Sequence, residues 1–259
     1  MPHPKDDMFL SVIIPAFNEE MYLEQTLERI KSALDENERM DLSWELIVCD
    51  NNSGDKTSEI ASAFGARVIF EPINQISRAR NRGASIAKGE WLLFIDADSY
   101  PEPALIAEMI DRIRSRKIIG CGTTVRVKGG TLFNKLRMER VNPFFRLFGL
   151  SGGAFLLCQA DAFRAIDGFS TDLYAYEEID FIIRLKRHGR KVGKRFAVMH
   201  QHPVVTSGRK GDVGLRSLGL LYLSNFSAVV LLLLYYLVPA SLVRWLGNRL
   251  LGYWYPRRR

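Results

Sequence analysis

The chain has 259 residues, of which 47% are hydrophobic and 25% are charged, and its formal net charge at pH 7 is +7. This length and composition exclude a disordered chain and allow one full-sized hydrophobic core with a small appendage. The excess of basic residues suits a phosphate-bearing substrate or an anionic membrane surface, with nucleic acid as a further option. The three cysteines lie far apart without a C-x-x-C pair, which argues against a zinc or dithiol site and favours a reducing, cytosolic setting.

The first hundred residues alternate between short apolar runs and amphipathic segments. Residues 9–16, for example, form an apolar run, and the apolar residues of the next segment recur at helical spacing. Such alternation with short loops predicts an α/β fold with a mostly parallel, doubly wound sheet, whose ligand crevice lies at the carboxyl ends of the strands. The expected strands are 9–16, 44–50, 67–71 and a run that begins at Trp91, and the expected helices are 23–34, a segment that ends at Phe64, and 77–87.

The chain between residues 101 and 202 continues this alternation with one irregular segment. Residues 131–150 mix aromatic and basic side chains around Pro143, so they form either a core helix broken at that proline or a basic, aromatic surface that faces a membrane or an acceptor. Two glycines open the run 151–158, where a ligand or another backbone segment can approach closely. The expected elements are helix 105–113, strand 118–127, strand 151–158, and helix 177–188 with Gly189 as its C-cap.

Two carboxylates, Asp96 and Asp98, follow the apolar strand that begins at Trp91. At the carboxyl end of a strand they face the expected ligand crevice. A D-x-D pair offers two hard oxygen ligands on one side of the backbone, which suits Mg²⁺ or Mn²⁺ holding a diphosphate. The alternative is structural, because aspartate is also common in turns and at helix starts: Asp96 would cap the turn and Asp98 would help to start the next helix.

Five segments of the chain resemble, in sequence, order and spacing, the motifs of the family 2 glycosyltransferases with the GT-A fold. They lie between residues 9 and 202 and read SVIIPAFNEE, LIVCDNNSGDKT, SRARNRGA, LLFIDADS and EEIDFIIRLKRHG. The resemblance implies a GT-A fold and an inverting, metal-dependent transfer of a sugar from a nucleotide donor, with a UDP-sugar as the expected donor. A nicotinamide-dependent dehydrogenase is a weaker alternative, because no G-x-G-x-x-G motif follows the first strand.

The resemblance also implies roles for individual residues. Asp50 would bind the nucleotide base, Arg78 and Arg80 would contact the donor, and Asp96 and Asp98 would hold the metal and the diphosphate. Simpler explanations stay open for three of these residues, because Asp50 also fits an ordinary turn and the two arginines also fit the solvated face of a helix. The other residues implied for the nucleotide pocket are Pro15, Phe17, Asn18, Glu19 and Asn52.

Glu178 falls at the position of the family's catalytic base, but the local sequence departs from the family pattern. The usual pattern is Glu-Asp with a second Asp two residues on, whereas this chain has Glu177, Glu178 and then Asp180. Glutamate can still take a proton from an acceptor hydroxyl, although it is one methylene longer. These acids also fit the first turn of a helix, where they complement the helix dipole. A catalytically silent, membrane-bound sensor or scaffold that binds nucleotide sugars is therefore the main alternative function.

His200 and His202 follow a probable strand and could supply the third protein ligand of the metal. Members of the family often carry a histidine near this position, and neutral imidazole suits Mn²⁺ better than Mg²⁺. The expected cofactor is Mn²⁺ or Mg²⁺, held by Asp96, Asp98 and one of the two histidines. The alternative is that these histidines only pack or are exposed.

Residues 218–243 contain no formal charge and include the run VVLLLLYYLV, with basic residues on both flanks. A helix of this length can cross a hydrocarbon core of about 30 Å. We therefore expect a membrane helix here and not a buried soluble helix. The expected units are a transferase domain at 1–206 and a membrane-anchoring segment at 207–259.

These features together predict a membrane-associated glycosyltransferase with its catalytic domain in the cytoplasm. The N-terminal sequence MPHPKDDM has no apolar stretch, so no cleavable signal peptide is expected. The expected partners are a nucleotide-sugar donor, a lipid-linked or glycan acceptor, and the membrane, with no nucleic acid.

Overall fold

The computed structural model describes residues 8–37, 42–130, 132–173 and 177–208. Segment 218–243, which is expected to form a membrane helix, lies outside these residues, and so does nearly all of the expected anchoring unit 207–259. None of the helices in the described ranges combines the length and the hydropathy needed to span a bilayer.

Strands and helices alternate through most of the described chain. The strands are β1 (Met8–Ala16), β2 (Leu42–Asp50), β3 (Arg67–Phe70), β4 (Trp91–Ile95), β5 (Ser99–Tyr100), β6 (Ile118–Lys128), β7 (Phe155–Gln159) and β8 (Arg195–Ser207). The helices are α1 (Leu23–Asp35), α2 (Thr57–Ala63), α3 (Ile76–Ala84), α4 (Pro103–Arg114), α5 (Leu132–Phe148), α6 (Ala160–Ala165) and α7 (Glu177–Lys191).

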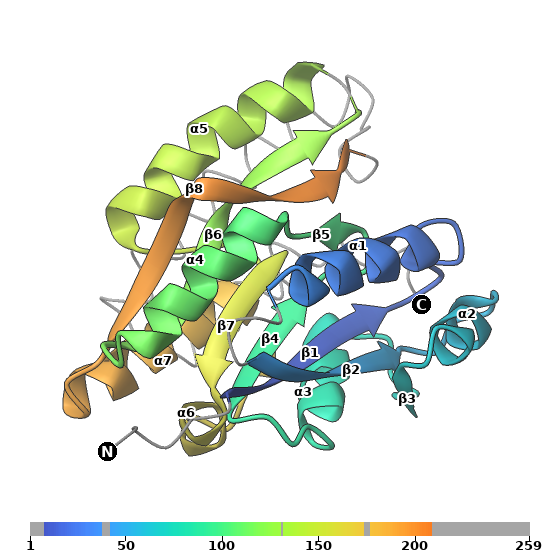
Figure 1. Cartoon of the computed structure of the whole chain (residues 1–259), viewed down its shortest axis with the longest axis horizontal. Helices are drawn as coiled ribbons and strands as arrows, with labels where there is room; N and C mark the ends of the chain where they lie inside the picture. The colour runs from blue at the N-terminus through green and yellow to red at the C-terminus, as the bar shows by residue number, and fades with distance from the viewer. Residues whose placement is uncertain (1–7, 38–41, 131, 174–176, 209–259) are drawn as a thin grey trace.

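The described strands form one mixed sheet with the order β3-β2-β1-β4-β7-β6-β8-β5 (Figure 1). The first four strands run parallel, whereas β7 is antiparallel to both of its neighbours, β4 and β6. β6 and β8 pair in parallel, and the short β5 lies antiparallel to β8 at the edge. The prediction of an α/β fold with a mostly parallel sheet is thus confirmed for β1–β4, while the second half of the sheet is mixed.

Two hydrophobic clusters lie on opposite faces of the sheet, as the side chains of β1 illustrate. Val12 and Ile14 belong to the cluster that includes residues of α1 and α4, whereas Ile13 belongs to the cluster that includes residues of α6 and α7. This separation follows from the two-residue repeat of a strand. Because helices cover both faces, the central strand β4 is apolar and buried along its whole length.

α5 is one helix that continues through Pro143, so the expected break at this proline does not occur. Asn142 ties the helix to β6, because its side chain accepts a hydrogen bond from the Val125 N–H (3.0 Å) and donates one to the Val125 carbonyl (2.9 Å). On the other side of the proline, Phe144 packs against the hydrophobic cluster that includes residues of α6 and α7, whereas Leu147 is 80% exposed. The described part of α5 is therefore part core helix and part exposed apolar surface.

Two predictions about glycines between residues 151 and 189 are wrong. Gly189 is not a C-cap, because α7 continues to Lys191 and the residue with positive φ is Gly193 (φ 69°). Glycine is required at 189 for a close approach, since a Cβ there would lie 2.7 Å from the carbonyl oxygen of Lys194. The expected strand 151–158 begins only at Phe155, and the Arg80 side chain lies against Gly153 in the loop that precedes it.

Candidate functional site

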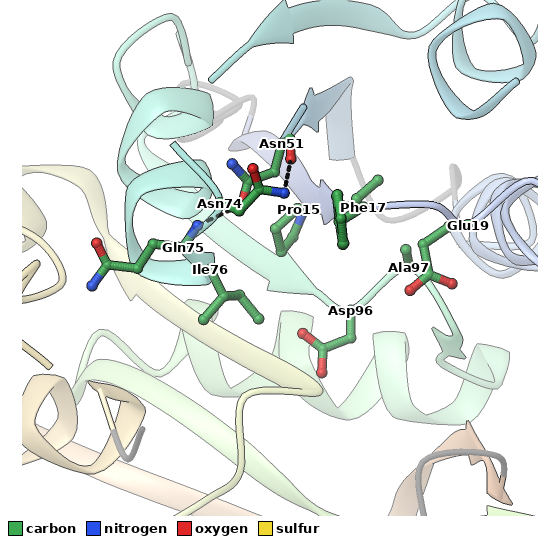
Figure 2. Close-up of a pocket in the computed structure, with 10 residues that line it drawn as sticks. Pro15, Phe17, Glu19, Asn51, Asn74, Gln75, Ile76, Asp96 and Ala97 are labelled. Carbon is green, nitrogen blue, oxygen red and sulfur yellow. Dashed lines mark hydrogen bonds between the residues drawn. The ribbon is translucent and has the colours of Figure 1, made fainter. Parts of the chain in front are cut away.

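The carboxyl ends of β1, β2 and β4 meet at one edge of the sheet and border a cavity (Figure 2). Its position agrees with the crevice expected for an α/β sheet. Four residues predicted for the nucleotide pocket line it, namely Pro15, Phe17, Glu19 and Asp96. The remaining lining residues are Ala16, Asn51, Asn74, Gln75, Ile76 and Ala97.

Asn18 fixes the loop after β1 to the loop after β2. It adopts a left-handed conformation (φ 53°), which asparagine tolerates better than most residues. Its N–H donates to Ser53 Oγ (3.0 Å), and its Oδ1 accepts from the Gly54 N–H (2.8 Å). The next residue, Glu19, donates its N–H to Thr57 Oγ1 (2.8 Å). Asn18 thus supports the rim of the cavity, and its contact with a nucleotide stays a prediction.

Asp50 and Asn52 lie in the turn at the end of β2. Asp50 is buried, and its Oδ1 accepts a hydrogen bond from the Ser53 N–H at 3.0 Å, so the turn role expected as an alternative is present. Asn52 is exposed, has a φ of 64°, and donates from Nδ2 to Asn74 Oδ1 (2.9 Å). Neither is among the residues that line the cavity, and base binding by Asp50 stays a prediction.

Asn51, which the sequence analysis did not single out, organises one wall of the cavity. Its buried amide donates to the carbonyls of Glu71 (3.1 Å) and Ile73 (2.6 Å), and its Oδ1 accepts from the Gln75 N–H (2.9 Å). These bonds shape the loop that carries Asn74 and Gln75 to the cavity. The position of Asn51 beside Asp50 at a strand end was the signal that could have identified it. Nothing in the sequence distinguished the loop that carries Asn74 and Gln75.

Arg78, predicted to contact the donor, is partly buried and donates from Nε to Gln75 Oε1 at 3.1 Å. Gln75 in turn donates to the carbonyls of Thr171 (2.8 Å) and Leu173 (3.0 Å). Arg78 therefore holds a lining residue in place, and a direct contact with the donor stays a prediction.

Arg80 is almost completely buried, with 2% of its surface exposed. Its Nη1 donates to Glu177 Oε1 (2.9 Å) and its Nη2 donates to Asp96 Oδ1 (3.0 Å). Burial opposes the charge, but Asp96 and Glu177 outweigh burial, so the pKa of Arg80 is raised. The alternative that Arg80 lies on the solvated face of a helix is wrong, because α3 turns this residue inward, toward two carboxylates. Contact with a donor is a separate prediction.

Glu177 and Glu178 begin α7 beside this arginine. Glu177 is buried, and burial raises its pKa against the opposing effect of Arg80. Glu178 is partly buried, and burial together with the neighbouring charge of Glu177 raises its pKa to about 8. An acid with this pKa holds its proton near pH 7 and accepts one only when the pH rises or when an added positive charge lowers the pKa. The start of α7 therefore carries an acid with a raised pKa beside Arg80.

Asp98 is buried, unlike Asp96, and lies against the end of β8. Its Oδ2 accepts from Ser207 Oγ (3.1 Å), and its carbonyl accepts from the Ser207 N–H (3.0 Å). The alternative that Asp98 helps to start the next helix is wrong, because α4 begins at Pro103 with Glu102 as its N-cap. Asp96 lines the cavity and is 21% exposed.

The two carboxylates fit a hard divalent cation in their chemistry, since both offer hard oxygen atoms at neighbouring positions of one turn. Three or more His, Cys, Asp or Glu residues placed to hold a metal are not found together anywhere in the described ranges. Asp96 and Asp98 could therefore supply part of a coordination sphere, and diphosphate oxygens and water would have to supply the rest.

His200 and His202 lie inside β8 and not in a turn after a strand, so that expectation is wrong. The pairing of β6 with β8 is irregular here, since Thr123 pairs with Met199 but Val125 pairs with Val204. Thr123 Oγ1 lies 3.2 Å from the carbonyls of both Met199 and His202 and holds this irregular segment. His200 is exposed and lines a separate groove beside α5. Metal ligation by either histidine stays a prediction.

Known protein sequences match this chain over most of its length. The family model described as Glycosyl transferase family 2 matches residues 11–171. A dolichol-phosphate mannosyltransferase of Pyrococcus furiosus is 33% identical over 155 residues, which cover 58% of this chain and 40% of that protein. A dolichyl-phosphate beta-glucosyltransferase of Dictyostelium discoideum is 31% identical over 110 residues, which cover 39% of this chain and 34% of that protein. The matches thus span less than half of the length of these curated relatives.

Solved structures share the architecture. S. aureus TarS, in complex with UDP-GlcNAc, has a TM-score of 0.60 at 19% identity and covers 79% of this chain and 60% of its own. The mannosyltransferase PcManGT from Pyrobaculum calidifontis, in complex with GDP-Man and Mn²⁺, has a TM-score of 0.59 at 18% identity and covers 79% of this chain and 58% of its own. At these identities the likeness shows the fold alone, and the mixed sheet with flanking helices fits the GT-A fold.

Proposed function

The chain belongs to glycosyl transferase family 2, and from this premise we propose that it transfers a sugar, with inversion, from a UDP-sugar to a lipid-linked or glycan acceptor. The observation that carries this proposal is a buried ion-pair network that joins an acid lining the cavity to the two acids that begin α7. Asp96 lines the cavity at the end of β4, and Arg80 joins it to Glu177, the neighbour of Glu178. The network thus links a proposed donor side, at Asp96, to a proposed proton-accepting side, at the start of α7.

On the donor side, the nucleotide would occupy the cavity between the ends of β1 and β2. Pro15 and Phe17 offer apolar surface for the base, and the amide of Asn51 holds in place the loop that carries Asn74 and Gln75 to the cavity. The solved relatives named above contain UDP-GlcNAc and GDP-Man, which supports a nucleotide diphosphate sugar as the donor class. The UDP-sugar is the choice that the resemblance of the motifs favours.

A divalent cation, Mn²⁺ or Mg²⁺, would be held by Asp96 and Asp98 and, on the prediction from the sequence, by His200 or His202. When bound, such an ion neutralises charge on a diphosphate leaving group. The presence of Mn²⁺ in the PcManGT complex supports this class of cofactor. On the protein side, Arg80 keeps the carboxylate of Asp96 in a fixed position through the bond to Oδ1, so that little reorganisation is needed when a donor enters.

On the proton-accepting side, Glu178 would act as the general base. The acceptor oxygen forms a bond to the anomeric carbon, the bond from that carbon to the diphosphate oxygen breaks, and the acceptor proton passes to the Glu178 carboxylate. Attack from the face opposite the leaving group inverts the configuration at the anomeric carbon. The raised pKa of Glu178, about 8, makes its carboxylate a stronger base than an ordinary glutamate once it has lost its own proton.

The proposed acceptor is lipid-linked, with the catalytic domain at the cytoplasmic face of a membrane. Two observations support this choice: the apolar run 218–243 and the names of the two curated relatives, which are dolichol-phosphate and dolichyl-phosphate transferases. Full-length protein should then sediment with membranes and resist extraction by high salt, while a chain that ends at residue 206 should stay in the supernatant. Full-length protein in the supernatant without detergent would contradict the anchor.

The main alternative is a catalytically silent protein that binds nucleotide sugars. The observation that favours it is Glu178 itself, because glutamate replaces the usual aspartate and its raised pKa keeps it protonated at neutral pH. A transferase releases the free nucleoside diphosphate, whereas a silent binding protein does not.

The proposed function is tested by incubating the full chain in detergent with Mn²⁺ and UDP-glucose, UDP-GlcNAc or GDP-mannose, with and without a polyprenyl-linked sugar, whose hydroxyl carries the acceptor proton. Release of the nucleoside diphosphate that increases with the acceptor supports the transferase. Binding of a nucleotide sugar without release, across pH 7 to 9, would support the silent sensor instead. Addition of EDTA is the matched control for the cation.

A further inference from the structure

A buried arginine joins three elements at the cavity: α3, the end of β4 and the start of α7. Arg80 contributes one nitrogen to Asp96 and another to Glu177, and Nη2 also lies 3.4 Å from the Gly153 carbonyl. Its two carboxylate partners are far apart in sequence, because Glu177 lies 97 residues from Arg80 and Asp96 lies 16 residues from it. The guanidinium is thus the physical link between the two acidic sides of the site.

The surroundings of Arg80 hold the guanidinium in one position. The Phe169 ring covers it, with the guanidinium carbon 5.2 Å from the ring centroid. Asn81, the next residue on α3, fixes Phe169, because its side chain donates to the Phe169 carbonyl (2.8 Å) and accepts from the Phe169 N–H (2.9 Å). An aromatic cover of this kind limits access of water and strengthens the ion pairs beneath it.

Gly153 provides the space for this side chain. A Cβ at position 153 would overlap Nη2 of Arg80 and would also lie 3.1 Å from its Cζ. The sequence analysis expected a ligand or another backbone segment to approach these glycines, and the group that approaches is the Arg80 side chain. The neighbouring Gly152 has no such requirement, because a Cβ there would lie 3.8 Å from Phe145, an ordinary contact distance.

We propose that Arg80 is a positioning residue for transfer, which holds the Asp96 carboxylate and the first turn of α7 in one arrangement, and that it does not itself bind the donor. This inference rests on the proposed function, since it gives Glu178 the role of base. Both terminal nitrogens of Arg80 are engaged, one by Glu177 and the other by Asp96, and only 2% of its surface is exposed. A buried arginine of this kind acts through the groups that it holds.

Lysine cannot reproduce this arrangement even though it preserves the charge. The guanidinium is planar and presents separate N–H groups to Glu177 and to Asp96, whereas an ammonium is a single point. Arg80→Lys should therefore fold, but one of the two carboxylates should lose its partner. The variant keeps the charge of the site and changes only the link.

The closing experiment compares Gly153→Ala with Gly152→Ala in the full chain. The first change pushes the guanidinium away without altering any charge, and the second is the matched control on the adjacent residue. Thermal unfolding in EDTA, with no nucleotide added, measures how much the packing of Arg80 against Gly153 contributes to stability when neither cation nor substrate is bound. We expect Gly153→Ala to lower Tm by about 4 °C or more and Gly152→Ala by less than half of that. In the Arg80→Lys background the cost of Gly153→Ala should shrink, because the overlapping nitrogen is gone.

The same variants are then measured for UDP binding by calorimetry and for turnover of the nucleotide sugar that the unaltered chain uses. Gly153→Ala and Arg80→Lys should each lower kcat by about tenfold or more and change the Kd of UDP measured in EDTA, where Asp96 cannot act through a cation, by less than about threefold. In a Glu178→Gln background, Arg80→Lys should lower kcat by less than about twofold further, because the residue it positions is already disabled.

Two results would overturn this role for Arg80. If the two glycine variants have the same Tm and the same kcat, the packing of Arg80 against Gly153 does not matter to the site. If Arg80→Lys raises the Kd of UDP about tenfold while kcat is unchanged, Arg80 is a donor ligand. A chain that releases no nucleoside diphosphate from any nucleotide sugar refutes the proposed function instead, and the Tm comparison then still decides whether the contact holds the fold.

Discussion

The two sides of the site are built in different ways. On the donor side, parallel pairing of β1, β2 and β4 brings three strand ends together, and each end supplies its side chains from a turn of a few residues. On the acid side, the start of α7 is joined to the cavity-lining Asp96 through Arg80, which lies 97 positions from its partner Glu177. The donor side therefore follows from local strand and turn chemistry, while the acid side depends on one buried ion-pair network.

The largest expected effect comes from removing the base on the acid side. Glu178→Gln keeps the shape of the side chain and removes its basicity, so kcat should fall by about 100-fold or more while the Kd of UDP stays nearly constant. Steady-state kinetics together with calorimetry would measure both quantities. Glu178→Asp, which restores the usual residue of the family, should retain turnover.

Asp180→Asn is the matched control for this prediction. Asp180 lies in the same first turn and binds Arg184 at 2.7 Å, so its loss should change kcat by only a few fold. If Asp180→Asn abolishes transfer while Glu178→Gln does not, the base must be reassigned within α7.

The pH profile should reveal the same acid. Because burial and Glu177 raise the pKa of Glu178 to about 8, the reactive carboxylate should increase about tenfold per pH unit below that value. We expect kcat/KM to rise up to about pH 8 and then level off. A profile that is flat from pH 6 to 9 would contradict the role of Glu178 as the base.

The raised pKa also predicts how stability changes with pH. The folded state binds this proton more tightly than the unfolded state, so the contribution of Glu178 to the free energy of unfolding should decline as the pH rises from about 4.5 to about 8. Denaturant titrations at several pH values should show this decline in the unaltered chain and a smaller one in Glu178→Gln. An equal decline in both proteins would show that other groups cause it.

A change on the donor side should affect binding more than chemistry. Asp98→Asn keeps an oxygen that can accept from Ser207 but removes the charge, so the Kd of UDP in the presence of Mn²⁺ should rise by about tenfold or more. Calorimetry with and without EDTA would measure it. UDP binding by the unaltered chain that is indifferent to EDTA would rule out this use of the carboxylate.

The smallest effect is expected from the loop that Asn51 organises. Asn51→Ala would leave the carbonyls of Glu71 and Ile73 and the N–H of Gln75 without their present partner. We expect the free energy of unfolding to fall by about 1–3 kcal/mol, with a modest loss of UDP affinity. The exposed neighbour Asn52 is the control, and Asn52→Gly, which tolerates the left-handed backbone at this position (φ 64°), should change stability much less. Equal effects of the two changes would contradict the role of Asn51.

Local patterns in the sequence predicted much of the fold and the donor side. The expected strands at 9–16 and 44–50 correspond to β1 and β2, and the apolar run at Trp91 is β4. Pro15, Phe17 and Asp96 were placed at strand ends and do line the cavity. These predictions succeeded because side-chain alternation, helical spacing and turn chemistry all act over a few residues.

Long-range packing decided the rest. The reversal of β7 and the position of His200 and His202 inside β8 depend on which strands pair across the sheet. Arg80 lies in a segment whose charges suggested a solvated helix face, and only the arrival of Glu177 and Gly153 makes a buried position favourable for it. A charge can be buried only where its partners come together, and the tertiary structure alone determines that.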